Sequence, residues 1–377
     1  MIYLLVTVLL VYCVLILIFI RGFDKVKIIQ KTNVAPSTKF AIVVPFRNEE
    51  NNILNLLNSI SQLDYPKNLF ELIVIDDDSD DDSVLIFNEW QKQNPEILSQ
   101  LLQNYRMSNS PKKDAISVAI EAMKNDWIIT TDADCELQIN WLTIFDNHIQ
   151  TTSSEMVAGA VFVNNQKRFL NFFQFIDLLS LQGTTIGSFG VKRPFMCNGA
   201  NFAYTKKLFH ELNGFDGNHK IASGDDVFLL QKALKFLPEK VAYLKNKQAI
   251  VFTNPEKTWQ SLFQQRVRWA SKTSAYDSFF GKFVAIAVFA MNAMIVTLVF
   301  ATFLNPVNLS MTIALFGVKI LVDYFLLTKT HRFVTNEMLI FPILSSLFYP
   351  FFCVSVALYS FFGRYKWKNR DFRNQLQ

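Results

Sequence analysis

The sequence has few of the residues that build covalent or zinc-bound frameworks. Its 377 residues include four cysteines and four histidines. No C-x-x-C pair occurs, the histidines are scattered, and the cysteines are far apart, at Cys13, Cys135, Cys197 and Cys353. Neither a disulfide framework nor a zinc site is therefore indicated.

Several motifs of other protein classes are missing as well. No G-x-x-x-x-G-K-[ST] phosphate loop and no nucleophilic Ser/His arrangement is found. The net charge of +5 and the pI near 8.8 suit an anionic partner. Because no basic–aromatic stripe or RNP-like motif accompanies this charge, we expect no nucleic-acid partner and assign the excess to an anionic membrane surface.

Apolar residues make up 51% of the chain and the mean hydropathy is +0.20, with the excess at the two ends. Residues 1–21 are expected to form a transmembrane helix, because their apolar run is long enough to cross a bilayer and lacks signal-peptide features. A buried core helix is the alternative. Arg21, Lys25 and Lys27 follow, so the positive-inside rule places the next domain in the cytoplasm, at the inner or plasma membrane.

The C-terminal region, residues 283–363, is also apolar and is expected to cross the membrane two or three times, with segments near 283–304, 309–328 and 338–362. Three spans would put the basic tail, residues 364–377, outside, against the positive-inside rule. Pro342 and Pro350 interrupt the last segment. A re-entrant hairpin that returns the tail to the cytoplasm is therefore the alternative.

Between the apolar ends, a linker at 22–39 leads into a domain at 40–256 in which strands and helices alternate. Apolar runs predict strands at 40–44, 69–75, 97–102 and 127–131, and helical spacing predicts helices at 51–63, 83–90 and 112–123. A further strand is expected at 155–163. This alternation is typical of βαβ units and a mainly parallel sheet.

Acidic residues follow the predicted strands. Asp132-Ala133-Asp134 comes after residues 127–131, and a run of six aspartates, 76–82 with Ser79 among them, comes after 69–75. Ligands bind at the carboxyl ends of parallel strands, and one or two carboxylates can hold a divalent cation with phosphate oxygens. A solvated acidic turn is the alternative for each. A calcium loop is rejected because its sixth and twelfth positions are Asp81 and Phe87.

Three later segments have two interpretations each. The aromatic-rich segment 168–189 is either an amphipathic helix at the membrane interface or ordinary core. Asp226 follows Gly224 at a predicted helix start, as an N-cap or as a catalytic base. Residues 257–282 form a basic amphipathic helix, which either lies on the membrane surface or lets Arg268 clamp a diphosphate while Trp269 stacks on a sugar ring.

These motifs together resemble the family 2 glycosyltransferases over roughly residues 40–275. In family order they are Val43-Val44-Pro45-Phe46-Arg47-Asn48-Glu49-Glu50, Asp76-Asp77 with Ser79 and Asp81, Lys113, Asp132-Ala133-Asp134, Asp225-Asp226 and Gln265-Arg266-Val267-Arg268-Trp269. The resemblance implies an inverting enzyme of GT-A fold: an α/β domain with a mixed, mainly parallel sheet and flanking helices, here with transmembrane helices at both ends.

The resemblance also implies roles for single residues. A UDP- or GDP-linked sugar donor would contact Pro45, Arg47, Glu49, Asp76, Asp77, Lys113 and Asp132. Asp134, with Asp132, would ligate Mg²⁺ or Mn²⁺ at the diphosphate. Asp226 would take the acceptor proton, and Gln265, Arg268 and Trp269 would shape the acceptor and leaving-group side. The family's D-D-G-S glycine is Asp78 here and its E-D glutamate is Asp225, so Asp225 stays a second candidate for the base.

The expected function is transfer of a sugar to a lipid or glycan acceptor at the bilayer by a multi-pass membrane protein. Two alternatives stay open. The Q-x-x-R-W motif also occurs in processive polysaccharide synthases, and the same fold could serve a non-catalytic membrane receptor.

Overall fold

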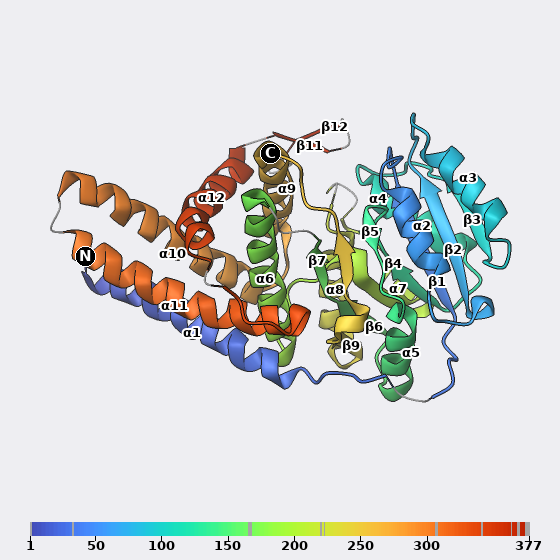
Figure 1. The fold of residues 1–377 in the computed structure, drawn as a ribbon, viewed down its shortest axis with the longest axis horizontal. Helices are drawn as coiled ribbons and strands as arrows, with labels where there is room; N and C mark the ends of the chain where they lie inside the picture. The colour runs from blue at the N-terminus through green and yellow to red at the C-terminus, as the bar shows by residue number, and fades with distance from the viewer. Residues whose placement is uncertain are drawn as a thin grey trace.

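The computed structural model describes residues 2–31, 34–164, 168–218, 221, 223–305, 308–340, 342–362, 364–367 and 370–373. An α/β domain lies at one end and long apolar helices lie at the other, with helices α6 (Phe169–Gly190) and α9 (Trp259–Ser271) between them (Figure 1).

The main sheet has seven strands in the order β3-β2-β1-β4-β8-β6-β9. Strand β1 pairs in parallel with β2 and β4, and β8 runs antiparallel to β4 and β6. The sheet is therefore mixed and mainly parallel, as predicted. The bounds are β1 Phe40–Phe46, β2 Phe70–Asp76, β3 Ser99–Gln103, β4 Trp127–Thr130, β6 Met156–Gly159, β8 Phe202–Thr205 and β9 Val241–Leu244.

Apolar cores cover both faces of this sheet, which explains why its strands are continuous apolar runs. Successive side chains of β1 alternate between them: Ala41 and Val43 belong to one core, and Phe40, Ile42 and Val44 to the other. The flanking helices are α2 Ile53–Ser61, α3 Ser83–Gln93, α4 Pro111–Ala122, α5 Trp141–Thr151, α7 Lys206–Glu211 and α8 Asp225–Phe236.

The prediction of one strand at 155–163 is wrong. The chain forms β6 and then β7 (Val161–Val163), which belongs to a small sheet with β5 (Cys135–Glu136) and β10 (Val251–Thr253). The Asn201 side chain donates hydrogen bonds to the carbonyls of Ala160 and Ala249, both at 2.8 Å. This buried amide holds the chain where it leaves one sheet for the other.

Among the described residues, four helices are long and apolar enough to cross a membrane: α1 (Ile2–Lys25), α10 (Phe279–Leu304), α11 (Asn308–Thr335) and α12 (Ile343–Phe362). Helix α1 continues four residues beyond the predicted end at 21, and α10 begins within the predicted segment 257–282. Helix α12 crosses α10 rather than running alongside it (Figure 1).

The chain after α12 forms a hairpin of β11 (Arg364–Trp367) and β12 (Arg370–Arg373), and β11 contacts α9. The basic tail thus begins beside α9. Residues 368–369 and 374–377 of the predicted tail lie outside the described residues.

Helix α6 joins the apolar helices to the domain. Its buried residues include Phe173, Phe175 and Leu179, whereas Phe169 is 44% exposed, so both interpretations of segment 168–189 stay open. Glycines let α1 approach its backbone closely. A Cβ added at Gly187 would lie 2.5 Å from the carbonyl oxygen of Phe19, and one at Gly190 would lie 1.8 Å from that of Gly22. Small residues at such crossings are typical of membrane helix pairs.

We predict that Gly187→Ala destabilises the protein by about 1–3 kcal/mol, because the added methyl forces packed helices apart. Gly317→Ala is the matched control in a second apolar helix, since no atom lies within 4 Å of its added Cβ. Thermal unfolding in detergent measures both. Equal melting temperatures for the two variants would show that the α1–α6 contact tolerates the methyl.

Candidate active site

Asp77, Asp132, Asp134, Asp225 and Asp226, from separate parts of the chain, line one cavity of about 2190 Å³ at the carboxyl edge of the sheet. Asp77 follows β2, Asp132 and Asp134 follow β4, and Asp225 and Asp226 begin α8. The strand order reverses direction between β1 and β4, since β2 and β3 lie on one side of β1 and β4 lies on the other. Ligands bind at such positions in open α/β sheets. The convergence expected from the sequence is therefore present.

Most of the other predicted site residues line the same cavity. Pro45, Arg47 and Glu49 come from the end of β1 and the loop after it, and α9 supplies Gln265, Arg268 and Trp269. Helix α9 begins with a capping box, in which Thr258 and Ser261 bond each other's backbone amides. The cavity is thus bounded by the sheet edge on one side and by α9 on the other.

Two predicted residues do not line the cavity. Asp76 accepts a hydrogen bond from the backbone amide of Ser79 at 3.0 Å and so shapes the acidic turn. Lys113 is 1% exposed and donates to the carbonyls of Asn218 and Ile221 at 2.8 and 3.1 Å. Burial lowers the pKa of Lys113 to about 8. The adjacent lysine, Lys112, lines the cavity instead.

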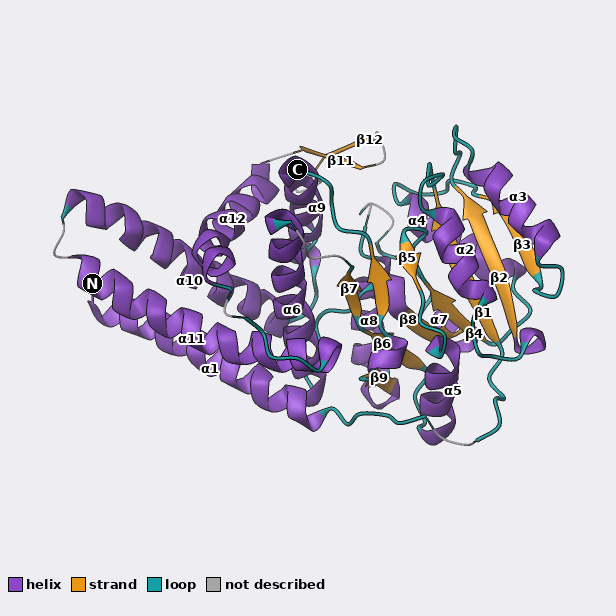
Figure 2. Ribbon diagram, in the orientation of Figure 1, coloured by secondary structure: helices purple, strands orange, loops and turns teal. Residues whose placement is uncertain are grey.

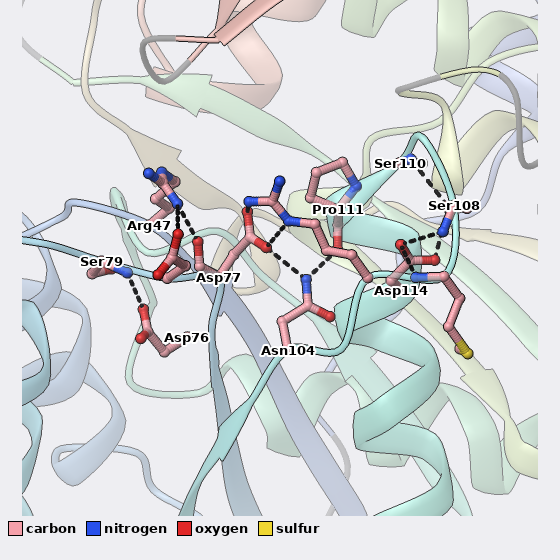
Figure 3. A network of polar contacts seen from close by, with 12 residues as sticks. Arg47, Asp76, Asp77, Ser79, Asn104, Ser108, Ser110, Pro111 and Asp114 are labelled. Atoms are coloured by element: carbon pink, nitrogen blue, oxygen red, sulfur yellow. Dashed lines mark hydrogen bonds and ion pairs between the residues drawn. The ribbon is translucent and has the colours of Figure 1, made fainter.

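Asp77 is held by side chains that follow β3 (Figure 3). Its carboxylate accepts hydrogen bonds from Asn104 Nδ2 at 2.8 Å and from Arg106 Nε at 3.2 Å. Its main-chain oxygen accepts from Arg47 Nη1 at 2.6 Å. The sequence reasoning missed Asn104 and Arg106, although polar residues directly after a predicted strand were the signal used for the other strands.

Lysines lie between the carboxylates of the cavity. Lys112 Nζ is 2.5 Å from Asp132 Oδ1 and 3.7 Å from Asp225 Oδ2, and Lys272 Nζ is 3.9 Å from Asp226 Oδ1. Neither lysine was predicted. The site therefore places two ammonium groups within 4 Å of three carboxylates.

The adjacent carboxylates Asp225 and Asp226 differ in their environments. Burial raises the pKa of Asp225, and Lys112 opposes this only in part. Burial also acts to raise the pKa of Asp226, but Lys272, Lys112 and backbone amides bring it below its ordinary value. Those amides belong to Gly199 and Val227, at 2.9 and 2.7 Å from the carboxylate. Asp226 thus has the lower pKa of the two.

Asp132 and Asp134 supply oxygen ligands of the kind that Mg²⁺ and Mn²⁺ take. Asp134 Oδ2 also accepts a hydrogen bond from Thr253 Oγ1 at 3.2 Å. Within the described ranges no group of three or more His, Cys, Asp or Glu side chains is placed to hold a metal. Two carboxylates fit an ion that completes its coordination with water and phosphate oxygens.

Comparison with known proteins agrees with the fold. Residues 41–212 match the family described as glycosyl transferase family 2. The α/β domain belongs to that family over these residues. The matched region includes Asp77, Asp132 and Asp134 and ends before Asp226.

The probable glycosyltransferase YdaM of Bacillus subtilis is 25% identical over 255 residues, which are 64% of this chain and 56% of that protein. The poly(ribitol-phosphate) beta-N-acetylglucosaminyltransferase TarS of Staphylococcus aureus is 34% identical over 96 residues, 26% of this chain and 16% of TarS. The chain thus spans less than two thirds of either relative.

The solved structure of the mannosyltransferase PcManGT from Pyrobaculum calidifontis, in complex with GDP-Man and Mn²⁺, is similar over 95% of this chain and 98% of that one. The TM-score is 0.55 at 14% identity. This similarity shows that the glycosyltransferase domain and the helices around it share a GT-A-like fold with that protein.

Lys112 and Lys113 provide a matched test of the site. We predict that Lys112→Met lowers sugar transfer about 10- to 100-fold, because its charged hydrogen bond to Asp132 and its ion pair with Asp225 are lost. Lys113→Met leaves two buried carbonyls without donors and should lower the free energy of unfolding by about 1–3 kcal/mol. Thermal unfolding and nucleoside diphosphate release measure these effects. The reverse pattern would place Lys113, and not Lys112, in the site.

The pH dependence of transfer distinguishes the two candidate bases. A base with a lowered pKa stays ionised in mild acid, so with Asp226 as base kcat/KM should stay flat down to about pH 5. A base with a raised pKa becomes protonated at a higher pH than an ordinary aspartate. With Asp225 as base, kcat/KM should therefore already fall above about pH 5 as the pH is lowered. The measurement is kcat/KM against pH, with the protein's stability followed in parallel.

Proposed function

We propose that this protein is an inverting glycosyltransferase that transfers a sugar from a UDP- or GDP-linked donor to a lipid or glycan acceptor at the membrane. The observation that carries this proposal is the single cavity shared by Asp77, Asp132, Asp134 and Asp226. The YdaM and TarS names and the GDP-Man complex of PcManGT support a nucleotide-sugar donor.

In this proposal Asp226 accepts the proton of the acceptor oxygen as that oxygen attacks the anomeric carbon. The bond between the anomeric carbon and the diphosphate oxygen breaks from the opposite face, and its electron pair leaves with the nucleoside diphosphate. Lys112 and Arg268 stabilise this growing negative charge. A divalent cation held by Asp132 and Asp134 would neutralise diphosphate charge when bound. Asp77 and Arg47 orient the nucleoside.

We further propose that the catalytic domain faces the cytoplasm. Arg21, Lys25 and Lys27 lie at the end of α1 that adjoins the domain, and the positive-inside rule assigns such ends to the cytoplasm. The donor would then be taken from the cytosol, and the acceptor from the adjoining membrane leaflet.

The test is a screen of UDP- and GDP-sugars for nucleoside diphosphate release by the purified full chain with Mn²⁺. We expect Asp226→Asn to lower the rate about 10²- to 10⁴-fold, the usual contribution of a general base. Asp134→Ala and chelation by EDTA should also stop transfer. Adding Mn²⁺ after EDTA should restore the activity of the wild-type protein.

Asp126→Asn is the matched control, because this exposed aspartate lies just before β4, at the opposite edge of the sheet. It should keep the wild-type rate. Full turnover by both Asp226→Asn and Asp134→Ala would refute the assigned roles, and lack of release with every donor would refute the proposed activity.

A further inference from the structure

The cavity continues beyond the candidate active site into the apolar helices. The volume of about 2190 Å³ is well above the 300–1,000 Å³ typical of a site for one small ligand. Its lining passes from the aspartates along α6 and α9 to α10 and α12. The space is therefore large enough for a second molecule beside the nucleotide sugar.

The far end of the cavity has apolar walls. Helix α10 contributes Val284, Ala285 and Val288, and α12 contributes Phe352 and Val356 together with the rings of Tyr349 and Tyr359. The aliphatic and phenylalanine side chains offer no hydrogen bonds, so sugar hydroxyls placed against them would lose their water without compensation. A hydrocarbon chain gains free energy at the same surface. The walls thus select against a soluble glycan in this part of the cavity.

The outer faces of the same two helices are apolar as well. Ile286 of α10 is 66% exposed and Leu358 of α12 is 50% exposed, next in sequence to cavity-lining residues. Both helices are long and apolar enough to lie in a bilayer. The apolar end of the cavity is therefore enclosed by helices of the kind that lie among lipid chains. Figure 2 shows the two helices crossing beside α6 and α9.

Between the apolar end and the aspartates the lining is basic and aromatic, from Arg268, Trp269 and Lys272. Lys272 Nζ lies 3.9 Å from Asp226 Oδ1. Helix α9 also contacts α12, with the rings of Phe263 and Phe352 6.2 Å apart. A polar head at α9 and a chain between α10 and α12 can thus belong to one molecule.

We propose that the acceptor is an amphipathic lipid whose hydrocarbon chain lies between α10 and α12 and whose head places a hydroxyl or phosphate oxygen at Asp226. This inference rests on the proposed transfer reaction and names the acceptor class for the same site.

The test uses the full chain in phospholipid vesicles with the donor found by nucleoside diphosphate release, carrying a radiolabelled sugar. The vesicles contain either a long-chain alcohol or a long-chain alkyl phosphate, which distinguishes the two kinds of accepting oxygen. Water-soluble sugar glycosides form a third arm. Ala285→Trp and Ala357→Trp fill the cavity from two helices, and Ile286→Trp and Leu358→Trp place the same ring on the outer faces as matched controls.

We expect the wild-type protein to move label into the organic phase with one of the two lipids. Both cavity variants should lower that transfer by at least about tenfold, the scale of steric exclusion from an apolar pocket. The controls should stay within about twofold. Donor release to water without any lipid should be within about twofold in all four variants, which shows that each variant is folded and binds the donor.

Lipid transfer within about twofold of wild type in both cavity variants, or label only on the soluble glycosides, would overturn the lipid assignment while the transferase proposal stands. Lack of donor release by the wild-type protein would overturn the transferase proposal itself. A photoreactive long-chain alcohol gives a readout that needs no activity. It should crosslink to α10 or α12 in the wild-type protein and not in Ala285→Trp. Equal labelling of the two proteins would count against a lipid chain bound in the apolar end of the cavity.

Discussion

A buried ion pair joins α9 to α6, the two helices that lie between the α/β domain and the apolar helices. Arg266 Nε lies 2.6 Å from Asp177 Oδ2, and the two side chains are 7% and 6% exposed. The guanidinium also lies over the Trp269 ring, 4.2 Å from its centre. Leaving either charge alone in this position would be costly, typically about 3–5 kcal/mol. Because α6 packs on α1 and α9 bounds the cavity, this pair fixes where Arg268 and Trp269 face the aspartates.

Much of the fold and site followed from local patterns. Apolar runs followed by polar or acidic residues located β1, β2 and β4 to within a few residues, and parallel pairing brings the ends of such strands to one edge whatever the loops between them. Adjacent residues were harder to separate. Lys112 and Lys113 differ by a third of a helical turn, and which one faces the cavity depends on the packing of the loop near Asn218, which no local pattern reports.

Contacts between distant segments account for the rest. Lys272 reaches Asp226 across 46 residues, and Asp177 reaches Arg266 across 89. Arg266 occupies a variable position of the Q-x-x-R-W motif, so the motif gave no reason to single it out. Likewise, hydropathy located four apolar helices but carries no information on their mutual angles. The crossing of α10 by α12 depends on side-chain packing between the helices.

The close contact of α1 with α6 has a consequence for how this protein can be divided. A membrane anchor attached by a loose tether could be exchanged for any other apolar helix. Here the backbone of α1 fits against Gly187 and Gly190, and Lys245 of the domain donates to the carbonyl of Phe23 at 2.6 Å. The first helix is therefore an integral part of the fold. A soluble fragment without α1 would expose the face of α6 around Gly187 and Gly190, which α1 covers in the full chain.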